Sequence, residues 1–155
     1  DGETFSIASA NGPVAVSSTD PVRGIATSGW RGRSFSFGIA DSVTVLAGSA
    51  AQADIAATLI ANEVDLPRSI KVRRAPAAAL YPDSDLGQRR VTVEVAELTD
   101  AEVDRALSRG LEFAGRLRSS NLIAAATLGL NNDIRTLEAT PAGAASAIMG
   151  IRQHA

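Results

Sequence analysis

The sequence of 155 residues contains no cysteine and a single histidine, His154. Without cysteine, disulfides, thiolate nucleophiles and cysteine-ligated zinc or iron–sulfur sites are excluded within this sequence. A lone histidine one residue from the end is a poor candidate for a general base. Nucleophilic catalysis of the Ser–His or Cys–His type is therefore not expected, and no catalytic residue can be named.

Long apolar runs and a strong excess of one charge are missing as well. No apolar stretch approaches the ~20 residues that span a bilayer, and no basic patch followed by an apolar segment marks a signal peptide. The net charge of −2 gives no general reason to expect a nucleic-acid partner. We therefore expect a cytoplasmic protein that binds neither membrane nor nucleic acid.

The residues that are present indicate one globular domain. Hydrophobic residues make up 45% of the sequence and charged residues 21%, which is typical of a chain with a packed core. The order of strands, helix, strands, helix and strands predicts a mixed α/β fold of the α+β type, with two main helices packed on a sheet. We expect a single domain at 1–138 and a tail at 139–155, either a short helix or a segment docked on a partner.

Local patterns place the elements. Alternation and turn signals predict strands at 4–8, 14–16, 24–27, 42–47, 70–74, 91–95, 122–128 and 134–137, with turns at 11–12, 19–21 and 131–133. Capping-box patterns predict helix starts at Ser49, with Gln52 three residues on, and at Thr99, with Glu102. The two helices are expected to end at Glu63 and Leu117.

A polar stripe runs along the first helix. Apolar residues of the segment 53–64 cover most of a helical wheel, which predicts a mostly buried helix, and Asp54, Thr58 and Asn62 follow at i, i+4 and i+8. Because a buried unpaired polar group costs roughly 1–3 kcal/mol, the stripe should face polar groups. A carboxylate and a hydroxyl one turn apart can both reach Mg²⁺ through oxygen. The alternative is local bonding, in which Asp54 accepts backbone N–H groups and Thr58 bonds the i−4 carbonyl.

The loop Ser28–Arg33 combines two glycines, two arginines and the single tryptophan, Trp30. Backbone N–H and guanidinium groups could hold a carboxylate or phosphate while Trp30 stacks on an aromatic ring, and Asp41 could add a second carboxylate to the site. The alternative is a hairpin loop with solvated arginines. Asp83 and Asp85 offer another oxygen pair, in a segment whose composition a turn also requires.

Three segments, read in order, resemble the ApbE-type flavin transferases: Ala26-Thr27-Ser28-Gly29, Val43-Thr44-Val45 and Ala53-Asp54-Ile55-Ala56-Ala57-Thr58. The sequence is still more similar to an uncharacterised bacterial and archaeal family related to those enzymes, through Gly38–Val45 and Asp83–Gly87. Some members of that family are described as 6-hydroxynicotinate reductases. The resemblance covers roughly residues 24–130 and implies the C-terminal part of an ApbE-like domain, with Asp54 and Thr58 as Mg²⁺ ligands near a flavin (FAD or FMN).

The interval Trp30–Asp41 contains neither His nor Pro, where flavin transferases carry a His-Asp-Pro-x-Thr-Gly segment. The resemblance therefore implies fold and binding rather than flavin transfer. Any chemistry would be oxidoreductase-associated, with the metal and cofactor supplying it. A small anionic aromatic, such as a nicotinate-like acid, or a flavin would be bound by Thr27, Ser28, Gly29, Trp30, Arg31, Arg33 and Asp41.

A second hypothesis is a non-catalytic domain that pairs with another chain or with a copy of itself. The strands at 4–16 lack an evident partner, and the apolar tail at 142–151 offers a contact surface. Because these strands lack neighbours, we expect either an oligomer or a companion N-terminal fragment. On this view the protein is a homo-oligomer or part of a larger assembly.

Overall fold

The computed structural model of this chain describes residues 4–9, 12–17 and 21–139. Antiparallel strands and helices alternate in it, and this confirms the predicted mixed α+β class. Asn11, residues 19 and 20 of the second expected turn, and the tail at 140–155 with His154 lie outside the described residues.

A four-stranded antiparallel sheet forms the centre of the fold. Its strand order is β3 (Gly24–Ser28), β4 (Ser42–Ala47), β7 (Ala125–Leu130) and β8 (Asp133–Leu137). Asn131 and Asn132 connect β7 to β8 with φ values of 52° and 67°, the backbone that a two-residue type I′ turn requires. The predicted closing pair of strands is present, but β7 spans 125–130 rather than 122–128, and β8 already begins at Asp133.

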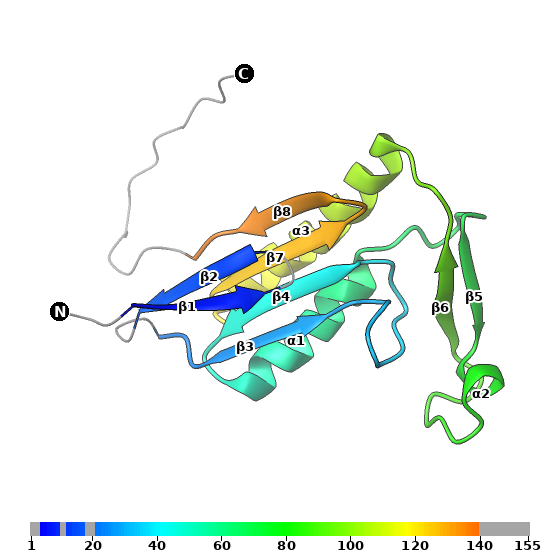
Figure 1. The fold of residues 1–155 in the computed structure, drawn as a ribbon, viewed down its shortest axis with the longest axis horizontal. Coiled ribbons are helices and arrows are strands. Elements are labelled where there is room, and N and C mark those ends of the chain that lie inside the picture. The colour runs from blue at the N-terminus through cyan, green and yellow to red at the C-terminus, as the bar shows by residue number, and fades with distance from the viewer. Residues whose placement is uncertain (1–3, 10–11, 18–20, 140–155) are drawn as a thin grey trace.

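Two helices cover one face of this sheet, as Figure 1 shows: α1 (Ala50–Glu63) and α3 (Asp100–Ser119). Both begin where the capping patterns predicted. The Ser49 side chain accepts from the Gln52 backbone N–H, and Thr99 and Glu102 form a complete capping box. Val43, Val45 and Leu128 on the covered face of the sheet are fully buried beneath the helices.

Two further strand pairs flank this core. β1 (Thr4–Ser9) pairs with β2 (Gly12–Ser17), and β5 (Val72–Pro76) pairs with β6 (Arg90–Val95). Among the described strands, neither pair joins the four-stranded sheet. A single turn of helix, α2 (Ala77–Leu80), follows β5 in the segment that the sequence indicated only as a connection. Propensity alone does not predict so short a helix.

The prediction that α1 is mostly buried is wrong. Its buried face consists of small residues with one large one, Ala53, Ala56, Ala57, Ile60 and Ala61. On the outer face, Ile55 is 61% exposed and Leu59 44% exposed. Small residues let the helix pack closely on β3 and β4, so the apolar residues on the remaining circumference face outward.

Candidate functional site

The loop after β3 brings Trp30 and Arg31 onto the carboxylate of Asp41. The indole Nε1–H of Trp30 donates to Asp41 Oδ1 at 3.3 Å, and Arg31 Nε lies 3.2 Å from the same oxygen. The guanidinium of Arg31 also stacks over the Trp30 ring, 4.9 Å from its centroid. Three of the residues predicted to bind a ligand are therefore in mutual contact.

Backbone packing holds this loop against the sheet. A Cβ atom on Gly29 would lie 2.2 Å from the Asp41 carbonyl oxygen, so only glycine permits this close approach of two backbones. The second carboxylate oxygen of Asp41, Oδ2, accepts from the Asn131 backbone N–H at 2.8 Å. Asp41 thus ties the loop to the turn between β7 and β8.

A cavity of about 90 Å³ borders the cluster. Besides the cluster itself, its walls include the end of β6, the link to α3 and the β7–β8 turn, through Val95, Glu97, Leu98, Leu130 and Asn131. Small-molecule pockets are typically roughly 300–1,000 Å³, so this cavity could enclose only part of a ligand. Because Asp41 already contacts three donors, its carboxylate is suited to orienting Trp30 and Arg31 rather than to acting as a free base.

Thr27 and Arg33 lie on either side of Trp30 and Arg31 in the sequence. The Thr27 Oγ1 atom lies 2.8 Å from Thr44 Oγ1 on the neighbouring strand. Ala26 packs against the core, so Thr27, which follows it, points to the sheet face that the helices leave uncovered. Arg33 is exposed and has no ion partner among the described residues, which leaves its guanidinium available to an anion.

Asp54 and Thr58 are both exposed on α1, one turn apart. Within the described part of the chain neither side chain has a hydrogen bond or ion pair, so the alternative of local bonding is not found. Carboxylate and hydroxyl oxygens fit a hard cation, but they supply only two ligands. No group of three or more acidic or histidine side chains is placed to hold a metal in residues 21–139. An Mg²⁺ ion here would need water, a ligand or another chain to complete its coordination.

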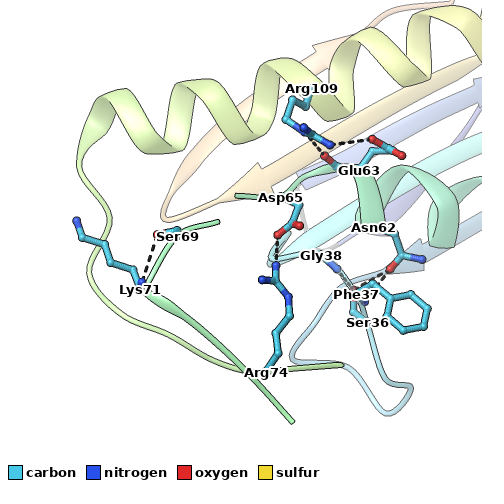
Figure 2. Close-up of polar contacts among 10 residues, drawn as sticks. All are labelled: Ser36, Phe37, Gly38, Asn62, Glu63, Asp65, Ser69, Lys71, Arg74 and Arg109. Atoms are coloured by element: carbon cyan, nitrogen blue, oxygen red, sulfur yellow. Dashed lines mark hydrogen bonds and ion pairs between the residues drawn. The ribbon is translucent and has the colours of Figure 1, made fainter. Parts of the chain in front are cut away.

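Asn62, the third residue of the polar stripe, is satisfied within the fold (Figure 2). Its Oδ1 atom accepts from Ser36 Oγ at 3.1 Å and from the Phe37 backbone N–H at 3.0 Å. A Cβ atom on Gly38 would lie 2.0 Å from the Ala61 carbonyl oxygen, so this loop rests directly on the end of α1. Asn62 therefore anchors the segment that leads into β4.

The structure does not bring Asp54 and Thr58 next to the Trp30 cluster. The start of α1 packs on Gly24 at the beginning of β3, whereas the Trp30 loop follows the other end of that strand. Near that far end, the Ile39 N–H donates to the Val64 carbonyl just after α1. From Asp54 to Asn62 the helix rises about 12 Å. A ligand that touched both places would have to extend along α1 as well as reach from the helix to the loop.

The segment with Asp83 and Asp85 consists of turns. The Ser84 N–H donates to the Tyr81 carbonyl at 3.0 Å, and the Gly87 N–H donates to the Ser84 carbonyl at 3.1 Å. Gly87 has a φ of 54°, which favours glycine. The turn that this composition indicates is confirmed.

Sequence reasoning missed Asn131 and Glu97 as neighbours of the Trp30 cluster. The Asn-Asn pair was identified only as a turn, although its backbone N–H meets Asp41. That contact depends on the register of β4 with β7, which pairs Ser42 with Gly129. No local pattern specifies a pairing between residues so far apart in the sequence.

Of the helices in the described part of the chain, none is long and apolar enough to cross a membrane.

Comparisons with known proteins place the chain in a family. No curated protein and no solved structure matches the chain. One family model, described as AbpE bacteria, matches residues 4–136, which is most of the sequence. The chain therefore belongs to this bacterial family.

Proposed function

We propose that this chain is an ApbE-like binding domain that takes a small anionic aromatic, such as a nicotinate-like acid, or a flavin-type ligand. The proposal rests on one observation: Trp30 and Arg31 are held together on Asp41 at the edge of a cavity. An indole provides a stacking surface, and guanidinium groups complement a carboxylate or phosphate. A role beside a 6-hydroxynicotinate reductase-like activity follows from the motif resemblance alone.

The two ligand classes make different demands on the chain. A nicotinate-like acid needs only the loop, with its ring on Trp30 and its carboxylate between Arg31 and Arg33. A flavin-type ligand would have to extend from the loop toward Asp54 and Thr58. Mg²⁺ held by those two residues would neutralise phosphate charge on such a ligand.

Fluorescence of Trp30, the single tryptophan, provides a direct test. Titration with nicotinate should quench it saturably, whereas the uncharged nicotinamide should act only weakly. Arg31→Gln with Arg33→Gln should lower the affinity about tenfold or more, because charge-assisted hydrogen bonds contribute about 1.5–3 kcal/mol. Arg116→Gln, an exposed position on α3, serves as the matched control. Equal quenching by the two compounds would contradict the proposal.

The metal part is tested separately. Calorimetric titration with Mg²⁺, in the presence and absence of FMN, should give heat with the wild type and none with Asp54→Ala. Because Asp54 is exposed and unpaired within the described residues, the variant should retain its thermal stability. Absence of magnesium heat in both proteins would remove the metal assignment and leave the loop proposal standing.

A second candidate function is an assembly domain without catalysis, and the exposure of Ile55 and Leu59 favours it. Two large aliphatic side chains on one exposed helix face indicate a surface that another chain could cover. Ile55→Asp with Leu59→Asp should then abolish a concentration-dependent mass in sedimentation, and Ser108→Asp on α3 should not. A monomer at every concentration would count against this candidate.

A further inference from the structure

A cleft of about 830 Å³ lies between the segment that joins α1 to β5 and the first turns of α3. Residues 65–71 form one wall, and Glu102, Arg105 and Arg109 form the other. The α3 residues follow at i, i+3 and i+7, so they share one face of the helix. The volume falls within the range of small-molecule sites, roughly 300–1,000 Å³.

Every carboxylate at this cleft already has a cationic partner. Lys71 Nζ lies 2.7 Å from Glu102 Oε2, and Arg109 Nη2 lies 3.3 Å from Glu63 Oε2. Figure 2 shows Arg74 pointing at the carboxylate of Asp65, with which it is paired. The lining of the cleft therefore holds four cations, Arg68, Lys71, Arg105 and Arg109, against two carboxylates, Asp65 and Glu102, which leaves two positive charges over. Counting the adjacent partners Arg74 and Glu63 as well does not change this excess.

The paired carboxylates are not free to neutralise the two remaining arginines. The side chains of Asp65 and Arg74 are only 13% and 16% exposed, so this pair is largely buried, and Asp65 belongs to the lining of the cleft. Burial raises the pKa of Asp65, with the Arg74 guanidinium acting in the opposite direction. The hydrogen bond from Lys71, with those from Thr99, lowers the pKa of Glu102 to about 2. Arg68 and Arg105 are exposed and have no ion partner within the described residues.

An apolar side chain stands at the same cleft. Ile70 is 100% exposed, although isoleucine is among the residues most often buried. Unpaired guanidinium groups beside an uncovered aliphatic side chain complement a ligand that has charged oxygens at one end and an apolar body at the other.

We propose that this cleft binds a small organic dianion, whose oxygens contact Arg68 and Arg105 and whose apolar body packs on Ile70. The two charges of a phosphate monoester or of a dicarboxylate would both match the local excess of positive charge. The proposal does not rest on the function proposed for the loop, because the cleft shares no residue with the Trp30 cluster.

Calorimetric titration of the whole chain with phenyl phosphate, phthalate and uncharged benzyl alcohol tests this proposal. At least one of the two dianions should bind, and benzyl alcohol should not. The dianion that binds shows whether the cleft takes a phosphate monoester or a dicarboxylate. Arg68→Gln and Arg105→Gln should each weaken binding about tenfold or more. Arg116→Gln makes the same change of charge on α3 outside the cleft and should change affinity less than twofold. No binding of either dianion, or an equal loss with Arg116→Gln, would overturn the proposal.

Two further variants make the test specific. Ile70→Ala should weaken the binding of phenyl phosphate a few-fold and leave the binding of inorganic phosphate unchanged. An equal effect on the two affinities would refute the apolar contact. Arg31→Gln with Arg33→Gln should remove any binding of phenyl phosphate at the loop and leave intact the binding that depends on Arg68 and Arg105. If that pair abolishes it, the dianion binds at the loop and the cleft proposal fails. All these side chains are exposed, so thermal unfolding should show the wild-type transition for each variant.

Discussion

Gly110 and Gly115 both lie in α3, but they face different surroundings. A Cβ atom on Gly110 would lie 2.3 Å from Val64 Cγ2 and 2.8 Å from Leu128 Cδ2, and both of those residues are fully buried. A Cβ atom on Gly115 would have nothing within 4 Å. Replacing each by alanine therefore separates helix propensity from core packing.

The magnitudes follow from this difference. Alanine in place of a helical glycine contributes about 0.8–1 kcal/mol, so Gly115→Ala should stabilise the protein by about that amount. Gly110→Ala has the same gain, but overpacking of a rigid core costs typically about 1–3 kcal/mol. Val64 is β-branched and cannot rotate away freely. We expect Gly110→Ala to be less stable than Gly115→Ala by about 1–3 kcal/mol.

Urea unfolding followed by circular dichroism measures this difference, and thermal unfolding should show it as a shift of about 2–4 °C for each kcal/mol. The result bears on the cleft, because Val64 immediately precedes Asp65 and Arg109 immediately precedes Gly110. If both alanine variants are equally stabilised, α3 does not pack on Val64 and Leu128 as described. The position of the cleft wall that α3 forms would then be wrong as well.

Two other predictions concern polar contacts. The pKa of Glu102 is lowered to about 2 from 4.5, mainly by the hydrogen bond from Lys71, so stability that this carboxylate contributes above pH 4.5 should be lost as the pH falls toward 2. In Glu102→Gln, the unfolding free energy measured in urea should depend less on pH between 4.5 and 2 than in the wild type. An equal pH dependence in both proteins would contradict this role of Glu102. Asn62→Ala should cost about 1–3 kcal/mol in urea unfolding, because the Ser36 hydroxyl and Phe37 N–H lose their acceptor; a loss below 0.5 kcal/mol would refute that role.

The parts of the fold that depend on neighbours in sequence could be predicted. The capping box of Thr99 and Glu102 involves residues three apart, and the turn at Asn131 and Asn132 needs only two residues that tolerate positive φ. Such signals fix where an element begins or where a hairpin turns, without information about the rest of the chain. Both were placed correctly for this reason.

The parts that depend on distant packing could not be predicted. A helical wheel shows that α1 is apolar on most sides, but it does not show which sides meet the sheet, and Ile55 and Leu59 proved to be outside. The contact between Asp41 and Asn131 joins residues 90 positions apart. The cleft needs both the segment after α1 and the face of α3 with Arg105. Each wall alone resembles an ordinary charged surface.

The distribution of charge explains why a chain with a net charge of −2 can offer sites for anions. Asp41, Asp65 and Glu102 each have a cationic partner, so these carboxylates contribute to packing and do not repel an incoming anion. Within the described residues, the arginines without ion partners include Arg33 beside the Trp30 cluster and the two at the cleft. Anion binding at either place should therefore weaken as salt rises, because exposed charges are screened within about 8–10 Å at 0.10–0.15 M ionic strength. Affinity that remains at high salt would come from stacking on Trp30 or packing on Ile70. The size of this salt-independent part shows how much of the binding is due to recognition of the ring rather than to attraction between charges.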